Sequence, residues 1–418
     1  MSNYIFLFDL DSTISKKEIL PTISEKINKL SEMRELTEAT MKGIIPFKTS
    51  FLKRVNILKD IDVSIVREII KNIPLNEHIA RFIRNNSDRC YIVTGNLDVW
   101  IEELMKSLNM SNHVYCSKAH VKNNCINQVI SVADKELIAK QFVQPIVVVG
   151  DGDNDAGMAS LADIAIGFGG VRDIAPSLLR NIDYAFYDDK LCADFLEKLL
   201  WKKVKKMNKD DITIIICCAG MGTRLGIGYP KALIDIDGIP LIIRMLEQLK
   251  DYSDIRIVVG FQAELIIETV KKYRKDIMFV CNYDFYNTSI VDSINKALPF
   301  SRKYVVEIDG DLLIDKNDLD KFMSFPDECI GITEVNSQYP VFVKIKNDRV
   351  VDFSNSLSDK EWIGLVKLET EKMYGEGEYV FQNIKKYLPL PYINVNARDI
   401  DTADDYDKTI EWYLKNNR

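Results

Sequence analysis

The chain lacks the residue patterns that build soft metal sites and membrane segments. It contains only three histidines, His78, His113 and His120, and none has a paired spacing suited to zinc. Its eight cysteines include no Cys-x-x-Cys pair. No apolar run reaches the roughly 20 residues of a membrane span, and no basic region precedes the first apolar stretch, as a signal peptide requires. We therefore expect catalysis by carboxylates, lysines and metal.

A general excess of positive charge is also missing. The formal net charge is −7, which argues against a broad nucleic-acid-binding surface. Hydrophobic residues make up 47% and charged residues 28% of the sequence, as in ordinary soluble globular proteins. We interpret the cysteines as reduced core residues of a cytoplasmic protein. From these features we expect that the protein does not bind nucleic acid and does not insert into a membrane. They do not decide whether it forms a homo-oligomer.

The length of 418 residues allows two or three domains. A basic polar stretch at 201–211 suggests a boundary, so we expect domains at 1–205 and 211–418 joined by a linker at 206–210. Alternating strand and helix signals predict an α/β fold with two Rossmann-like domains. Strands are expected at 4–9, 89–94 and 145–150, and then at 212–217, 255–260, 276–281 and 303–308. Residues 16–85 read as a helical insertion.

Carboxylates follow two of these expected strands. Asp9 and Asp11 end the first strand, and Asp151 and Asp155 follow the strand that ends near Gly150. Strand ends about 140 residues apart meet only if the strands lie side by side in one sheet. Carboxylates that meet repel one another unless a cation lies between them, and oxygen ligands suit Mg²⁺. The pattern predicts a Mg²⁺ site that handles phosphate, with all four acids as candidate ligands.

The same residues suggest a covalent route for phosphate hydrolysis. Asp9 is the candidate nucleophile, and Asp11 is the candidate acid that protonates the leaving alkoxide and later activates water. Thr94, at the end of an expected strand, and Lys135, in a helix-like segment, are the candidate partners of the phosphoryl oxygens. A single aspartate at a strand end is usually only a helix cap or a turn residue, but the ordered set favours a site.

Residues 1–200 resemble the phosphoserine phosphatase branch of the haloacid dehalogenase-like phosphatases. The motif Asp9-Leu10-Asp11-Ser12-Thr13, then Thr94, Lys135 and the acidic motif at 150–155 match in order. The resemblance implies a core domain with a helical cap and a small zwitterionic phosphomonoester as substrate. One departure is that Thr94-Gly95-Asn96 stands where the family usually has Ser-Gly-Gly. The implied substrate-binding residues are Glu18, Met41, Phe47, Arg54, Gly95, Asn96 and Asn154.

The second half opens with a different phosphate motif. Ala219-Gly220-Met221-Gly222-Thr223-Arg224-Leu225 follows an apolar strand, and its glycines allow the backbone to approach phosphates. Arg224 and Lys231 add two cations, which suits a triphosphate whose pyrophosphate must leave. Asp311 and Asp401 are the candidate Mg²⁺ ligands. For Asp401 the alternative is a simple cap of a last helix at 404–416.

Residues 211–418 resemble sugar-phosphate-type nucleotidyltransferases, because Gly-x-Gly-Thr-Arg-Leu and Pro230-Lys231 reproduce their motif. The segments at 287–294, 308–311, 361–364 and 399–401 are most similar to bacterial CTP:phosphocholine cytidylyltransferases. The resemblance implies transfer from CTP to a small phosphomonoester, releasing pyrophosphate. The implied nucleotide-binding residues are Ala219, Gly220, Gly222, Thr223, Arg224, Lys231 and Gln262, and the implied substrate-binding residues are Asn287, Ser289 and Trp362.

The sequence therefore predicts a bifunctional enzyme with Mg²⁺ in both domains. Its substrates would be small phosphomonoesters and CTP or another nucleoside triphosphate. Two alternatives stay open. The second domain could be a sugar-phosphate or molybdopterin-type nucleotidyltransferase that uses UTP, dTTP or GTP, or one domain could be a silent binding or regulatory module.

Overall fold

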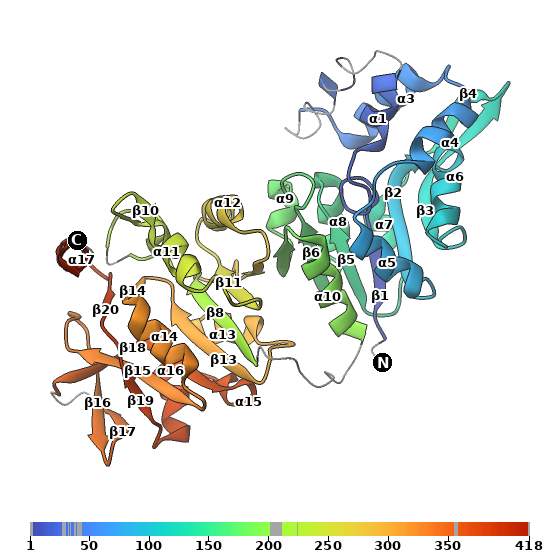
Figure 1. The fold of residues 1–418 in the computed structure, drawn as a ribbon. Coiled ribbons are helices and arrows are strands. Elements are labelled where there is room, and N and C mark those ends of the chain that lie inside the picture. Colours follow the sequence, from blue (N-terminus) through green and yellow to red (C-terminus); the bar gives the residue numbers. More distant parts are fainter. Residues whose placement is uncertain are drawn as a thin grey trace. The chain divides into compact units, whose positions relative to one another are not determined.

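The computed structural model divides the chain into two compact units, Met1–Val204 and Lys205–Arg418 (Figure 1). It describes all residues except 1–2, 27–30, 32, 34, 37–38, 40–43, 201–210, 224, 355–357 and 417–418, and the side chains of Phe47 and Asn416. The expected linker at 206–210 lies outside the described residues. Each unit has its own sheet and is described by itself.

The sheet of the first unit has the strand order β7-β6-β5-β1-β2-β3-β4. Its strands are parallel except for the antiparallel pair β3 and β4. The central strand β1 pairs with β5 on one side, where Phe8 lies opposite Val149, and with β2 on the other, where Phe8 lies opposite Ile92. The strands are β1 Ile5–Phe8, β2 Cys90–Leu97, β3 Val114–Lys122, β4 Cys125–Ser131, β5 Ile146–Gly150, β6 Ile164–Phe168 and β7 Tyr184–Phe186.

Continuous apolar strands explain why this sheet is covered on both faces. Phe6, Leu7 and Phe8 of β1 are all fully buried, as expected for a central parallel strand packed between helices. In Figure 1 the helices α1 and α3 lie beyond the carboxyl ends of β1 and β2. The described helices are α1 Ile19–Lys26, α3 Phe47–Leu58, α4 Val63–Lys71, α5 Glu77–Asn85, α6 Asp98–Ser107, α7 Lys135–Ala139, η1 Asp153–Asp155, α8 Ala156–Ala159, α9 Pro176–Leu179 and α10 Asp189–Leu200.

The second unit has a mixed sheet with the order β17-β16-β18-β13-β8-β11-β12. Strands β13, β8, β11 and β12 run parallel, whereas β18 pairs antiparallel with β13. The strands are β8 Ile212–Cys218, β9 Asp235–Ile236, β10 Ile239–Pro240, β11 Ile255–Val259, β12 Met278–Cys281, β13 Tyr304–Asp309, β14 Leu312–Ile314, β15 Cys329–Glu334, β16 Val341–Lys346, β17 Arg349–Ser354, β18 Lys360–Glu369, β19 Tyr392–Asn394 and β20 Ala397–Asp399.

A separate antiparallel pair, β14 with β20, brings two distant acidic segments together, because Leu312 lies opposite Asp399. The C-terminal helix packs on a small apolar core that includes Ile236, Leu313 and Ile400. The described helices are η2 Lys231–Leu233, α11 Leu241–Gln248, α12 Ala263–Tyr273, α13 Ile290–Ala297, α14 Lys316–Ser324, α15 Thr370–Met373, α16 Val380–Ile384, η3 Lys385–Tyr387 and α17 Ala403–Asn416.

The predicted fold class is confirmed: two Rossmann-like α/β units, the second with a mixed sheet. All seven expected strands are present within a few residues of their predicted bounds. The hairpin β3–β4 and the pair β14–β20 were not predicted. All eight cysteines are free thiols, and six of them are buried. In the part of the chain that the structure describes, no helix combines the length and the hydropathy needed to cross a bilayer.

Candidate active sites

The first site lies at the carboxyl edge of the sheet of the first unit. Asp9 directly follows β1, and its backbone N–H donates to the carbonyl of Val149 on β5 at 2.9 Å. Thr94 lies near the end of β2, and Asp151 directly follows β5. Because β1 pairs in parallel with both neighbours, these three residues reach the same edge of the sheet.

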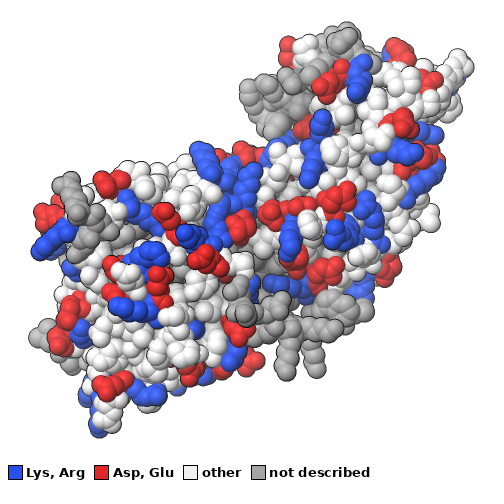
Figure 2. Space-filling model, viewed as in Figure 1, with Lys and Arg blue, Asp and Glu red and all other residues white. Residues whose placement is uncertain are grey.

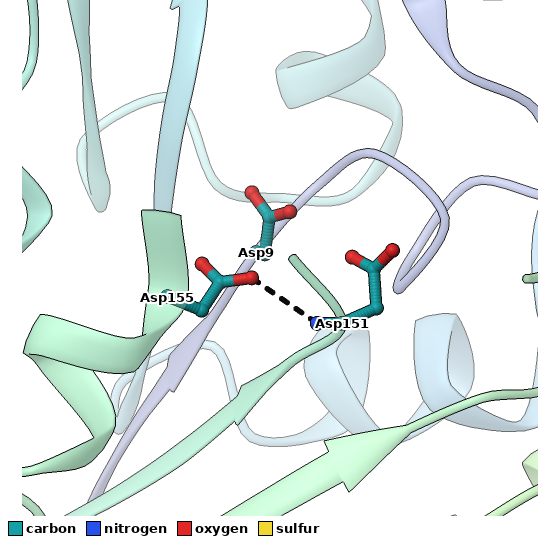
Figure 3. A group of neighbouring side chains, drawn as sticks. All are labelled: Asp9, Asp151 and Asp155. Atoms are coloured by element: carbon teal, nitrogen blue, oxygen red, sulfur yellow. Dashed lines mark hydrogen bonds between the residues drawn. The ribbon is translucent and has the colours of Figure 1, made fainter. Parts of the chain in front are cut away.

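Three carboxylates meet there (Figure 3). One oxygen each of Asp9, Asp151 and Asp155 lie within 4.8 Å of one another, and all three side chains are buried. Asp155 also accepts hydrogen bonds from the backbone N–H groups of Asp151, at 3.1 Å, and of Gly152, at 2.9 Å. Gly150 has no room for a side chain, because a Cβ there would lie 2.6 Å from the Asp155 carboxylate. The loop after β5 is thus folded around Asp155.

Lys135, the first residue of α7, neutralises part of this cluster. Its buried Nζ donates to Asp9 Oδ1 at 2.5 Å and to Asp155 Oδ1 at 2.6 Å. Burial alone would lower the pKa of Lys135, but the charges of Asp155 and Asp9 outweigh it and raise that pKa. The ammonium group therefore stays charged beside the candidate nucleophile.

The acids carry more negative charge than Lys135 can balance. Burial raises the pKa of Asp9 well above its usual range, and the neighbouring acids add to that effect. Burial likewise raises the pKa of Asp151 to about 7. Three buried carboxylates whose negative charge is only partly balanced suit a hard divalent cation such as Mg²⁺. Asp9, Asp151 and Asp155 would be its ligands. Asp11, a fourth predicted ligand, has its carboxylate outside this group of three.

The Asp11 carboxylate is held by two other segments. Its Oδ1 accepts a hydrogen bond from the backbone N–H of Ile19 at 2.7 Å, and its Oδ2 accepts one from the Asn96 amide at 2.6 Å. The same amide donates to Thr94 Oγ1 at 2.9 Å. The structure thus brings Asp11, Thr94 and Asn96 together, while Gly95 faces β3 and accepts from Ser117 through its carbonyl at 2.6 Å.

Three charged residues lie beside this edge on the side of α1 and α3. Glu18 precedes α1 and accepts from Arg172 Nη1 at 2.6 Å, while Arg172 Nε donates to Asp151. Arg54, on α3, is buried, and its Nε has no hydrogen-bond partner among the described residues. Burial lowers the pKa of Arg54 despite the nearby charge of Glu18. An anionic group would satisfy this buried donor.

The remaining predicted residues of the first site have mixed outcomes. Asn154 lies half-buried on η1, between the ligand candidates Asp151 and Asp155. Met41 and the side chain of Phe47 fall outside the described residues. Arg172 was missed by the sequence analysis. It follows β6 in a loop, and only the folded chain brings it to Glu18 and Asp151.

The second site lies at the carboxyl edge of β8 and β13. The glycine-rich segment follows β8, and Gly222 in it has a positive φ of 58°. A Cβ on Gly222 would lie 2.8 Å from Lys231 Cγ, so the loop packs directly on the lysine side chain. Lys231 Nζ donates to Asp311 Oδ2 at 2.8 Å and also to Asp401. A lysine, two acids and the glycine-rich loop therefore share one edge.

Asp399 joins these acids as a third candidate ligand that the sequence did not predict. One carboxylate oxygen each of Asp311, Asp399 and Asp401 lie within 4.8 Å of one another. Burial raises the pKa of Asp399 well above its usual range, and Asp311 and Asp401 raise it further. This donor set also fits Mg²⁺. Thr402, whose Oγ1 accepts from the Asp405 N–H at 3.2 Å, caps α17, so the capping role considered for Asp401 is wrong.

A cavity of about 710 Å³ opens over this edge. Its lining includes Ala219, Gly220, Gly222, Thr223, Lys231, the three acids and a fourth aspartate, Asp309. The wall also carries five aromatic side chains, among them Trp362 beside Phe381 at a ring distance of 6.3 Å and Tyr379 stacked on Phe381 at 5.6 Å. Glu378 lines the same wall. The cavity thus combines the charged groups and the glycine-rich loop with several aromatic rings and the carboxylate of Glu378.

Four residues predicted for the second site have different outcomes. Ser289 lines the cavity and caps α13, because its Oγ accepts from the Asp292 N–H at 3.1 Å. Among the described residues, neither Gln262 nor Asn287 lines this cavity. Gln262 donates instead to the carbonyl of Gly228 at 3.0 Å, and Asn287 donates to Asp284 at 2.7 Å. Arg224 lies outside the described residues.

Comparisons with known families agree with this division into two sites. Residues 6–160 match the haloacid dehalogenase-like hydrolases, and residues 214–345 match the MobA-like NTP transferase domain. A phosphoserine phosphatase from Archaeoglobus fulgidus is 26% identical over 215 residues, which cover 47% of this chain and 62% of that protein.

The second half has relatives of its own. The bifunctional protein GlmU from Sulfurimonas denitrificans is 28% identical over 200 residues, which cover 46% of this chain and 44% of that protein. A solved CTP:phosphocholine cytidylyltransferase from Streptococcus pneumoniae is 23% identical and covers 48% of this chain and 99% of its own, with a TM-score of 0.40.

Proposed function

Because the chain combines a phosphoserine-phosphatase-like haloacid dehalogenase domain with a MobA-like NTP transferase domain, we propose that it catalyses two reactions on small phosphomonoesters. The first is hydrolysis through a phosphorylated Asp9. The second is transfer of a cytidylyl group from CTP to an amino-alcohol phosphate or a similar phosphate, with release of pyrophosphate.

In the first reaction Asp9 attacks the phosphorus while the ester P–O bond breaks. Asp11 gives its proton to the leaving alkoxide, and then takes a proton from the water that attacks the phosphoryl group on Asp9. Inorganic phosphate leaves, and Asp9 is regenerated. Lys135 and Thr94 stabilise the phosphoryl oxygens, and a divalent cation held by Asp9, Asp151 and Asp155 would supply further positive charge.

The observation that supports a zwitterionic substrate is the pair of oppositely charged residues, Arg54 and Glu18, that lie beside the site near α1 and α3. Arg54 offers a buried donor without a partner in the described chain, which suits a carboxylate. Glu18 suits an ammonium group. Incubation with Mg²⁺ and phosphoserine should release inorganic phosphate, and Arg54→Leu should raise KM for phosphoserine more than KM for a phosphomonoester without a carboxylate.

In the second reaction an oxygen of the acceptor phosphate attacks the α-phosphorus of the nucleotide, and pyrophosphate leaves. The backbone of the glycine-rich loop and Lys231 offset the negative charge that develops on the phosphates. A divalent cation held by Asp311, Asp399 and Asp401 would polarise the phosphate oxygens. The shared cavity is the observation that carries this proposal, because the charged groups and the aromatic side chains line the same space.

The aromatic wall favours an acceptor with a cationic head. Aromatic faces attract quaternary and protonated amines, and Glu378 adds a full negative charge. We expect Trp362→Ala and Glu378→Gln each to raise KM for phosphocholine about 3- to 30-fold with KM for CTP nearly unchanged. Trp362→Phe is the matched control, because it keeps an aromatic face, and it should stay within about 3-fold of the wild type.

The deciding assay is pyrophosphate release with Mg²⁺, four nucleoside triphosphates and a panel of acceptors that includes phosphocholine, phosphoethanolamine, phosphoserine and sugar 1-phosphates. Release with CTP and an amino-alcohol phosphate supports the proposal. Release with UTP, dTTP or GTP and a sugar phosphate would favour the alternative nucleotidyltransferase. If no combination of nucleotide and acceptor released pyrophosphate, a binding or regulatory role would be favoured for the second unit.

A further inference from the structure

Asn96 has an unusual set of partners for a residue at the end of a buried strand. It lies on β2 two residues after Thr94, and only 2% of it is exposed. Its amide nitrogen donates to Asp11 Oδ2 at 2.6 Å and to Thr94 Oγ1 at 2.9 Å. An amide NH₂ group has two protons, so both bonds form at once. One side chain thus bridges the candidate general acid and the candidate phosphate-binding hydroxyl.

The bridge fixes the orientation of the Asp11 carboxylate. Oδ2 accepts from Asn96 on β2, while Oδ1 accepts from the backbone N–H of Ile19, the first residue of α1, at 2.7 Å. Each carboxylate oxygen is therefore held by a different element. Rotation of the carboxylate would break at least one of these bonds. Asp11 is consequently held in one position relative to Thr94 and the sheet edge.

The same bridge sets the direction of the Thr94 hydroxyl. Thr94 Oγ1 accepts from the Asn96 amide at 2.9 Å and from the Asn96 backbone N–H at 3.2 Å. These two donors occupy both lone pairs of the hydroxyl oxygen. The hydroxyl proton must then point away from Asn96, where it can serve as a donor to a phosphoryl oxygen.

We propose that Asn96 is a positioning residue of the phosphatase site, which holds Asp11 and Thr94 in the one arrangement that serves leaving-group protonation. The inference rests on the proposed hydrolysis. During that step the ester P–O bond breaks, the bond from phosphorus to Asp9 forms, and the proton of Asp11 passes to the alkoxide. The resembling phosphatases usually have glycine here, so the amide bridge is a feature of this chain.

The test compares a poor and a good leaving group. The alkoxide that leaves from an alkyl phosphate such as phosphoserine needs a proton from Asp11. The leaving group of p-nitrophenyl phosphate is p-nitrophenolate, which is stable without a proton. Rapid-quench measurement of phosphoenzyme formation in the full-length protein gives one rate for each substrate. Asn96→Gly should lower the phosphoserine rate about 10- to 100-fold and the p-nitrophenyl phosphate rate less than about 3-fold.

Asn96→Asp is the matched variant, because it keeps the volume and removes both donors. It should lower the ratio of the two rates at least as much as Asn96→Gly. The ratio within one variant does not depend on how much of the protein is folded. An unchanged ratio in both variants would overturn the positioning role while leaving the phosphatase function intact. Wild-type protein that forms no phosphoenzyme with either substrate would overturn both.

Discussion

At the scale of single residues, the two sites share the same arrangement of charged groups. A largely buried lysine, Lys135 in the first unit and Lys231 in the second, donates to two aspartates that come from distant segments. In both cases the acids outweigh the effect of burial and raise the lysine pKa. A lysine that stays charged limits the repulsion among the acids while leaving oxygen donors for a cation.

Glu307 leads to a prediction of how the stability of the folded protein depends on pH. It is fully buried on β13, and its carboxyl interacts with the side chains of Asp309 and Cys217. Burial raises the pKa of Glu307 from 4.5 to about 8. The folded state therefore keeps a proton that the unfolded state releases above pH 4.5. The stability that this proton maintains is fully present below pH 4.5 and is lost as the pH rises through about 8.

We expect Glu307→Gln to remove this part of the pH dependence, because an amide stays neutral. Hydrogen exchange of β13, corrected for the intrinsic effect of pH, should show protection that falls between pH 6 and pH 8.5 in the wild type. The fall should be smaller in Glu307→Gln. If protection fell equally with pH in the wild type and in Glu307→Gln, Glu307 would not be the cause of the pH dependence.

The sequence predicted those site residues that belong to short local motifs. Asp9 and Asp151 stand directly after strands, and Lys231 belongs to the Pro-Lys motif that follows the glycine-rich segment, so their place at a sheet edge follows from the chain itself. Arg172, Asp399 and Glu378 come from loops and an edge strand whose position depends on the whole fold. In the segment 399–401 the sequence singled out Asp401 but not Asp399, and no short motif indicates a site at Arg172 or Glu378.

At the scale of elements, the sites depend on loops that pack against side chains. Gly222 illustrates this, because its positive φ and the lack of space beside Lys231 both exclude a side chain. The sequence predicted the parallel strands from their continuous apolar runs. It did not predict the hairpin β3–β4, whose exposed residues interrupt the apolar pattern, or the short pair β14–β20.

The loop can be tested with two alanine substitutions. Gly222→Ala should lower pyrophosphate release at least about 10-fold, because the new Cβ would push Lys231 away from Asp311. Gly226→Ala is the matched control, since Gly226 also has a positive φ, of 71°, but no atom of the described residues lies within 4 Å of a Cβ there. Both variants bear a similar backbone strain, roughly 1–2 kcal/mol. A similar loss of activity in both would attribute the effect to strain rather than to Lys231.

At the scale of the whole molecule, one chain carries two candidate sites, for which we propose phosphate hydrolysis and nucleotidyl transfer. Both signs of charge occur on the visible face of each unit (Figure 2). Each candidate catalytic group lies within its own unit, and each unit has an acidic cluster of its own. We therefore expect the two activities to be separable by single substitutions.

Asp9→Asn should lower phosphate release about 10³-fold or more, because an amide cannot act as the nucleophile, while pyrophosphate release stays within about 2-fold of the wild type. Lys231→Ala should have the reverse effect, with a loss of about 10²- to 10³-fold in pyrophosphate release. Each variant is the control for the other, because both assays are run on the same preparations. If either substitution abolished both activities, the two sites could not be independent. If a single phosphomonoester serves both sites, Asp9→Asn should also raise the final yield of nucleotidyl product, since hydrolysis would no longer consume the acceptor.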